Sequence, residues 1–135
     1  MKQKFIWPIR VYYEDTDAGG VVFYANYLKF YERTRTEMLR AMGYQQDELI
    51  GQEKVIFVVR SVKIDYLRPA KFNEMLQVSA IVDSVRPASV TFAQDINCGE
   101  RLLSQAHIKI ACLDTETMRP KVIPEKLLEH FKHEC

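Results

Sequence analysis

The sequence predicts an α+β domain in which a five-stranded antiparallel sheet wraps around one long helix. Apolar and polar residues alternate in four segments after residue 54, which is typical of strands with one buried face. Earlier in the chain, the stretch from Asn26 to Met42 instead repeats its apolar residues at helical spacing. Because the sheet and the helix must each bury an apolar face, we expect the sheet to curl around the helix.

The size and composition of the chain fit a folded, soluble protein. Its 135 residues are predicted to form a single domain spanning 1–135, and its hydrophobic fraction of 47% is too high for a disordered chain. A formal net charge of +1 gives no field that would favour nucleic acid. The three cysteines are widely spaced and form neither a metal-ligand pair nor a redox motif. We therefore expect no metal and no nucleic-acid partner.

The N-terminal residues contain no secretion signal, and no run of about 18 apolar residues occurs anywhere in the chain. The sequence therefore predicts a cytoplasmic protein without a transmembrane segment. Peripheral association with the inner membrane is left open.

The first strand is expected within residues 5–13, where Pro8 either delays its start or places it at a sheet edge. The long helix is predicted from Asn26 to Met42, with Asn26 as its N-cap and Gly43 as the left-handed residue that follows it. A short amphipathic helix is expected after Pro124.

The four later strands are predicted in segments separated by turns that are rich in Pro, Gly and Asn: 55–66, 76–83, 89–98 and 105–112. Some apolar residues of the predicted sheet fall on its outer face: Phe57, Val59, Ile81 and Leu113. Their exposure would leave an apolar patch that a second subunit could cover, so we infer a dimer or a higher oligomer.

The densest polar feature of the chain is an acidic segment that contains Glu14, Asp15 and Asp17 and ends at Gly19 and Gly20. It follows a strand and runs into the N-terminus of the long helix, where free backbone N–H groups can stabilise a developing negative charge. A carboxylate beside such an oxyanion site could support hydrolysis without a metal or a serine nucleophile. On spacing alone, an acidic turn of this kind is more often a solvated loop.

Other interpretations of this segment fit less well. Asp15 and Asp17 could be interpreted as the site of an aspartyl phosphatase. Such phosphatases have a doubly wound sheet with several helices, whereas this chain is predicted to have one long helix. A calcium loop beginning at Asp15 would require Glu at its twelfth position, where the chain has Asn26. Gly19-Gly20 is not followed by the Gly-Lys-Ser/Thr of a phosphate loop.

The stretch from Val11 to Tyr27, VYYEDTDAGGVVFYANY, closely resembles the signature of the 4-hydroxybenzoyl-CoA thioesterase family of hotdog-fold proteins. More narrowly, it is similar to the YbgC branch, whose members are acyl-CoA thioesterases associated with the Tol-Pal system of Gram-negative bacteria. Residues 30–40 and 57–60 extend the similarity. The resemblance implies a hotdog fold, thioester hydrolysis and no cofactor, because coenzyme A is part of the substrate.

By this resemblance, Asp17 is the catalytic carboxylate, acting either as a nucleophile or as a general base on water. The backbone N–H of Tyr24 polarises the thioester carbonyl. Gly20 and Val21 belong to the turn that holds the substrate beside Asp17.

Relatives hold the phosphates of coenzyme A at the subunit edge with basic side chains, which implies a role for Arg86, with Arg119 and Lys121 as further candidates. An ordinary solvated side chain is an equal alternative for each of them. Arg60 interrupts the alternation of its strand, and it could reach the subunit interface or mark a β-bulge.

The predicted function is hydrolysis of acyl-CoA, first of short aliphatic acyl groups, by a homodimer or homotetramer that could also meet acyl carrier protein. The main alternative is a non-catalytic acyl-CoA or acyl-carrier-protein binding module linked to envelope or phospholipid metabolism. A hotdog dehydratase is disfavoured, because that chemistry uses a histidine and the first histidine of this chain is His107.

Overall fold

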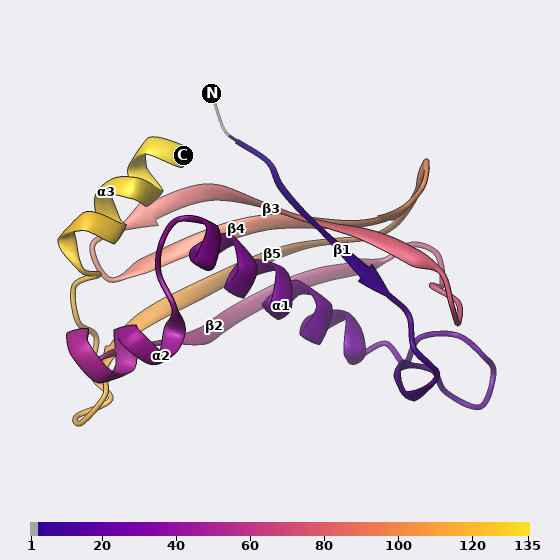
Figure 1. Ribbon diagram of the computed structural model, residues 1–135, viewed down its shortest axis with the longest axis horizontal. Helices are drawn as coiled ribbons and strands as arrows, with labels where there is room; N and C mark the ends of the chain where they lie inside the picture. The colour runs from indigo at the N-terminus through magenta and orange to yellow at the C-terminus, as the bar shows by residue number, and fades with distance from the viewer. Residues whose placement is uncertain (1–2) are drawn as a thin grey trace.

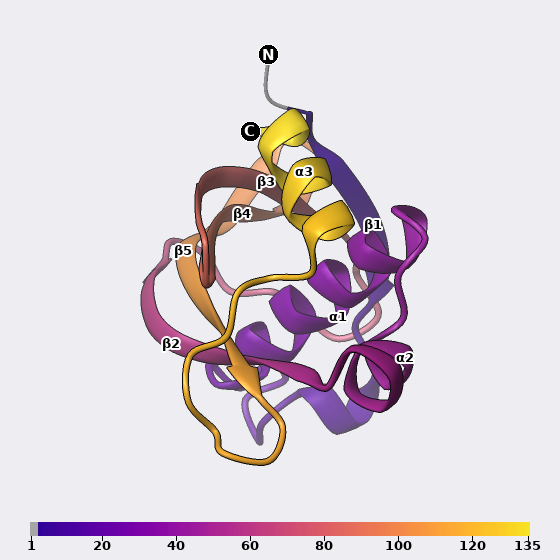
Figure 2. The ribbon, with the colours of Figure 1, turned by 90° about the vertical axis from the view of Figure 1, so that its left-hand side faces the viewer.

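The computed structural model describes residues 3–135 and confirms the predicted architecture. Five antiparallel strands pair in the order β1-β3-β4-β5-β2 and curve around the long helix α1, Asn26–Ala41 (Figures 1 and 2). The strands are β1 Phe5–Arg10, β2 Val55–Tyr66, β3 Met75–Arg86, β4 Ser89–Cys98 and β5 Arg101–Asp114. The remaining helices are η1 Tyr13–Asp15, α2 Gln46–Glu48, η2 Leu49–Glu53 and α3 Glu125–Glu134.

The strand β1 is an edge strand, as Pro8 predicts, but it begins at Phe5 rather than late. Pro8 pairs with Gln77 of β3, and an edge position tolerates its missing N–H. The strand ends at Arg10, because the chain then turns into η1.

The long helix begins one residue earlier than predicted, because an N-cap at Asn26 would make Tyr27 its first helical residue. Ala25 is its N-cap and Asn26 is its first helical residue, so the predicted capping role of Asn26 is wrong. The amide Nδ2 of Asn26 instead donates to the carbonyl oxygen of Asp15 at 2.9 Å, which ties the helix to the acidic segment. At the other end, Gly43 has a φ of 95°, the left-handed conformation that glycine adopts at low cost.

The core lies between α1 and the inner face of β3, β4 and β5. Phe30 and Tyr31 of α1 are fully buried, and each contributes about 1.5–3 kcal/mol through burial of its apolar surface. Of the strand residues predicted to face inward here, Cys98 is half-buried and the others are buried: Leu76, Val78, Ala80, Val82, Val90, Phe92, Ile96, Ala106, Ile108, Ile110 and Cys112. Burial raises the pKa of the Cys112 thiol to about 11, so this side chain is a neutral apolar group.

The strand β2 differs from the prediction, because its expected inward face is largely open in a single chain. Only Val55 is buried, whereas Val62 is 39% exposed and Tyr66 is 43% exposed. The register between β2 and β5 shifts between Val59 and Ser61, so Arg60 does mark a β-bulge. No helix in the described part of the chain is long and apolar enough to cross a membrane.

Glu74 joins the loop before β3 to the β4–β5 hairpin, and this arrangement predicts a pH dependence of stability. Its carboxylate accepts hydrogen bonds from the Lys71 N–H at 2.7 Å and the Cys98 thiol at 3.5 Å, and it pairs with Arg101. Burial acts to raise the pKa of Glu74, but these bonds outweigh it and the pKa is lowered. Because the folded pKa is depressed, the stabilisation is complete above pH 4.5, the ordinary value, and is lost as the pH falls below it.

We therefore expect Glu74→Gln to flatten the loss of thermal stability between about pH 5 and pH 3. Melting temperatures measured across this range check the expectation. The matched control is Glu100→Gln, at an exposed position of the β4–β5 turn. Parallel curves for Glu74→Gln and wild type would contradict it.

Candidate functional site

The predicted catalytic residue, Asp17, is exposed in a tight turn between η1 and α1. Its carboxylate Oδ1 accepts the Gly19 N–H at 2.8 Å, which fixes the direction of the side chain. The Asp17 N–H donates to the Val21 carbonyl at 2.9 Å, and the Gly20 N–H donates to the Asp17 carbonyl at 3.1 Å. The turn therefore presents one carboxylate to the solvent in a defined orientation.

Gly20 closes the turn with a φ of 80°, which a residue with a Cβ adopts only with strain. Val21 next bridges to Lys71, and the Val22 N–H donates to the Ala70 carbonyl at 2.8 Å. These contacts anchor the turn to the segment that precedes β3. Gly20 and Val21 thus lie beside Asp17, and their contact with substrate stays a prediction.

The three acidic residues of the segment differ in burial and in hydrogen bonding. The carboxylate of Asp15 is buried, with the residue 8% exposed, and it accepts the Tyr12 N–H at 2.8 Å. The carbonyl oxygen of Asp15 also accepts the Phe23 N–H at 3.1 Å. Asp15 therefore holds the segment together, whereas Glu14 and Asp17 are exposed.

The N-terminus of α1 lies directly after this turn. The carbonyl oxygens of Phe23, Tyr24 and Ala25 accept N–H groups of residues 26 to 28, so the helical turn is already formed there. Within residues 3–135, no hydrogen bond from the Tyr24 N–H is seen. This donor is therefore available to a ligand oxygen at the positive end of the helix dipole.

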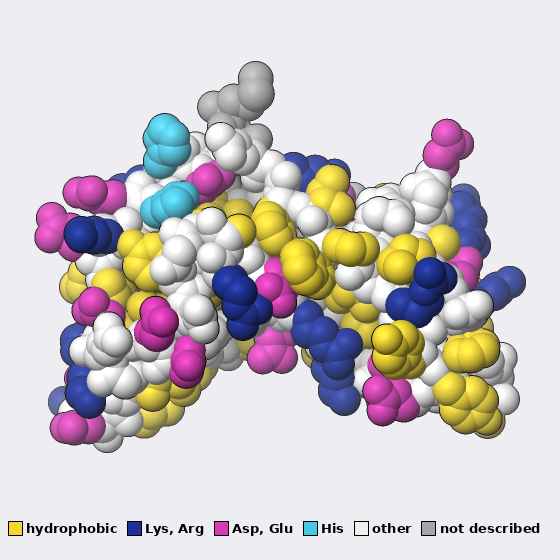
Figure 3. Space-filling view, viewed as in Figure 1, with side chains coloured by type: hydrophobic (Ala, Val, Ile, Leu, Met, Phe, Trp, Pro, Cys, Tyr) yellow, Lys and Arg dark blue, Asp and Glu magenta, His cyan; other side chains and the backbone are white. Residues whose placement is uncertain are grey.

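Aromatic side chains surround the same helix end. Tyr66 lies with its ring centroid 6.0 Å from Tyr24 and 5.2 Å from Tyr27, and the Tyr27 hydroxyl accepts the Ala70 N–H at 3.0 Å. Burial raises the pKa of Tyr27, which keeps its hydroxyl neutral. Hydrophobic side chains gather over this end of the molecule, at the right of Figure 3. A pocket of about 230 Å³ lies among Val22, these three tyrosines and the 67–69 segment.

The predicted phosphate-binding residues lie elsewhere in the chain. Met75, at the start of β3, pairs with Arg10 next to the site, whereas Arg86 ends the same strand about 36 Å away. Arg119 and Lys121 lie in the segment after β5, also at the far end (Figure 1). Lys121 Nζ is 3.7 Å from a carboxylate oxygen of Asp114. One chain therefore does not bring these cations together with Asp17.

Arg60 is exposed in the middle of the free edge of β2. Arg60 and Tyr66 are six positions apart, which is about 20 Å along a strand. A single chain therefore keeps Arg60 away from the Asp17 turn as well.

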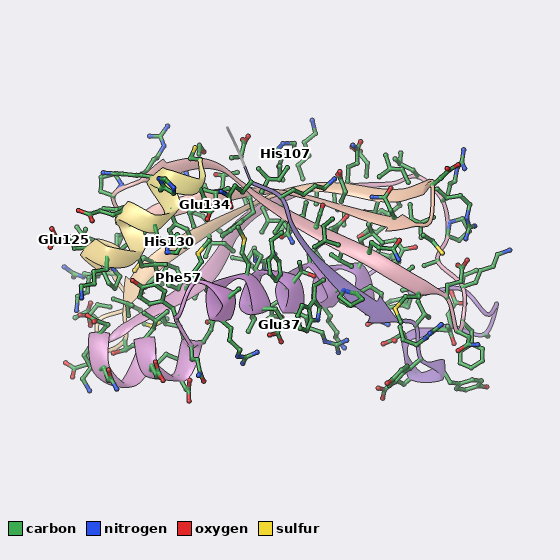
Figure 4. All side chains as sticks on the ribbon, turned by 45° about the horizontal axis from the view of Figure 1, so that its top comes forward. Glu37, Phe57, His107, Glu125, His130 and Glu134 are labelled. Carbon is green, nitrogen blue, oxygen red and sulfur yellow. The ribbon has the colours of Figure 1, made fainter. Side chains whose placement is uncertain are left out.

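A groove of about 470 Å³ runs along α1, from Leu28 in its first turn to Leu39 in its last, between the helix and strand β2. Its walls are mainly apolar, and the sheet side includes Phe92 and Ile108. Phe57 of β2 lies between α2 and α3 at the far end of the groove (Figure 4). This volume is in the range of small-molecule sites.

Sequence reasoning missed one buried polar group beside this groove. Arg35 of α1 is 7% exposed, and its Nη1 donates to Oε1 of Gln94 on β4 at 2.8 Å. Gln94 Nε2 in turn donates to the carbonyl oxygens of Tyr31 and Ser79, each at 3.2 Å. Two signals could have revealed the pair: Gln94 occupies an inward position of its strand, and Arg35 lies on the apolar face of its helix.

Comparison with known proteins gives consistent matches along almost the whole chain. The profile of the thioesterase-like superfamily matches residues 11–131. The acyl-CoA thioester hydrolase YbgC of Escherichia coli O6:H1 is 45% identical over 129 residues, covering 95% of this chain and 96% of that protein. The acyl-CoA thioesterase YbgC of Haemophilus influenzae is 43% identical, with 96% and 95% covered. The crystal structure of a probable thioesterase from Bartonella henselae has a TM-score of 0.87 at 36% identity, covering 90% of this chain and 100% of that one.

Proposed function

The chain belongs to the thioesterase-like superfamily and, within it, to the YbgC thioesterases, and on this premise we propose that it hydrolyses acyl-CoA to a free acid and coenzyme A. The observation that carries this proposal is the Asp17 carboxylate, fixed by the Gly19 N–H beside a helix N-terminus with an available Tyr24 N–H. One short segment, residues 17–24, therefore supplies both a basic or nucleophilic oxygen and an N–H donor for a carbonyl oxygen.

In the proposed reaction, the thioester carbonyl oxygen accepts the Tyr24 N–H, and the helix dipole stabilises the negative charge that develops there. The Asp17 carboxylate either attacks the carbonyl carbon or takes a proton from an attacking water. The carbon–sulfur bond breaks, the thiolate leaves and takes up a proton, and water supplies the oxygen of the new acid. The step needs no cofactor.

We infer that two copies of the chain form the complete site. The two edges of the sheet differ: β1 has six residues and contains Pro8, whereas β2 has twelve and exposes Val59 and Val62. A long free edge favours pairing with another strand, and that of β2 is the longer one. A second copy paired along β2 would bring its own basic residues toward the pocket beside Tyr24. In this dimer we propose that coenzyme A is held by four basic residues: Arg60, Arg86, Arg119 and Lys121.

The expected substrates are acyl-CoA thioesters, beginning with short aliphatic ones, and acyl carrier protein could present the same thioester. Release of free thiol from a series of acyl-CoA chain lengths tests the function. We expect turnover of at least one member by the wild-type protein. Binding of acyl-CoA without any thiol release would favour the alternative, a non-catalytic acyl-binding module.

A further inference from the structure

The groove along α1 is lined by a buried cation, Arg35, and the fold supplies an acceptor for only part of its guanidinium group. Arg35 is 7% exposed and lines the groove, whereas the sheet side of the groove is apolar. A buried charge costs free energy unless it is paired or fully hydrogen-bonded. The Arg35 guanidinium therefore needs an explanation beyond packing.

Most N–H donors of the Arg35 guanidinium have no acceptor in the described chain. A guanidinium has five N–H donors, and the structure gives Arg35 one acceptor, Oε1 of Gln94 at 2.8 Å. No carboxylate within residues 3–135 lies at salt-bridge distance from Arg35. Every side-chain nitrogen in this range that is closed off from solvent has a hydrogen-bond partner. The unused nitrogens of Arg35 must therefore have open space beside them, and the cavity that Arg35 lines is the groove.

The charges near Arg35 leave this end of the groove positive. Burial lowers the pKa of Arg35 to about 10 and the Glu32 carboxylate opposes this, so the side chain stays charged at neutral pH. Glu32 and Lys29 are both exposed on the same wall of the groove, and their charges offset each other. Among the charged residues that line the groove, Arg35 is the buried one.

The position of Arg35 along the helix suits the far end of an acyl chain. The thioester carbonyl is placed at the start of α1, and Arg35 lies nine residues after Asn26, about 13 Å along the axis. Helical side chains lean toward the helix N-terminus, which shortens this separation. An extended acyl chain of six to ten carbons can therefore begin beside Asp17 and end at the guanidinium.

We propose that the groove holds the acyl group and that Arg35 selects acyl chains ending in a carboxylate, so that the preferred substrates are coenzyme A monothioesters of dicarboxylic acids. The distal carboxylate accepts the unused N–H groups of Arg35, while the methylene chain lies against the apolar walls. This inference rests on the proposed function, because it needs acyl-CoA in the site.

The test compares kcat/KM for pairs of equal chain length, such as hexanoyl-CoA and the monothioester of adipic acid, up to ten carbons. We expect wild type to favour the carboxylate-ended member by about tenfold or more, the effect of a charge-assisted hydrogen bond. Arg35→Met should remove or reverse this preference, and Arg35→Lys should keep part of it. The ratio within one variant is independent of how much of that variant folds.

The matched control is Arg40→Met, an exposed arginine of the same helix that pairs with Glu37 and lies outside the groove. It should keep the wild-type preference. Equal kcat/KM values for both members in wild type, or an Arg35→Met variant with the wild-type ratio, would overturn the proposal.

If neither series is hydrolysed, the proposed function fails, and the same pairs are compared by calorimetric affinity. Tighter binding of the carboxylate-ended thioester by wild type but not by Arg35→Met would still support the role of Arg35. Equal affinities would overturn it.

Discussion

Replacing Asp17 by Asn is expected to lower kcat for acyl-CoA hydrolysis about a thousandfold, because the reaction loses its basic or nucleophilic oxygen. The amide oxygen of Asn can still accept the Gly19 N–H, so the turn should keep its shape. Affinity for acyl-CoA and the melting temperature should change little. Steady-state thiol release, calorimetry and thermal unfolding measure the three quantities.

The matched control for this substitution is Glu14→Gln, which removes an exposed carboxylate from the same segment. It should retain nearly wild-type kcat. If Asp17→Asn hydrolyses acyl-CoA as fast as wild type, Asp17 is not the catalytic group. A similar loss in both variants would point to the charge of the whole segment instead.

Placing charges on the free edge of β2 is expected to prevent self-association, and sedimentation is the readout because Val59 and Val62 also line the groove along α1. Val59 is 51% exposed and Val62 is 39% exposed on this edge, and two lysines there would have to be desolvated on pairing. We expect the double variant Val59→Lys with Val62→Lys to sediment as a single chain, whereas wild type sediments as a dimer or tetramer.

The opposite edge provides the control. Ile6 of β1 is 54% exposed, and Ile6→Lys should leave the oligomer intact, because this shorter edge contains Pro8. Sedimentation velocity distinguishes these outcomes. A monomeric wild type, or dissociation by Ile6→Lys and not by the β2 variant, would contradict the proposed interface.

The features predicted best from sequence were those that depend on local pattern. The inward positions of β3, β4 and β5 follow from alternation, and the break after α1 follows from Gly43. The Asn26 cap was wrong because the choice between a cap and the first helical residue depends on a partner eleven residues away, the Asp15 carbonyl.

The site was predicted in part. Composition gave three equivalent carboxylates, whereas burial separates Asp15, which bonds the Tyr12 N–H, from the exposed Asp17. The groove could not be predicted, because it depends on how far β2 curves away from α1. The Arg35–Gln94 pair was visible as two polar residues at apolar positions, but only the fold shows that they meet.

The central claim is that this chain cleaves acyl-CoA through Asp17, and the fate of bound acyl-CoA in a single turnover tests it most directly. Excess wild type or Asp17→Asn is mixed with the acyl-CoA that the chain-length series favours, and the products are identified by mass. The account predicts equal amounts of free acid and coenzyme A from wild type, and intact acyl-CoA bound to Asp17→Asn. Intact acyl-CoA on wild type, or cleavage by Asp17→Asn, would contradict it.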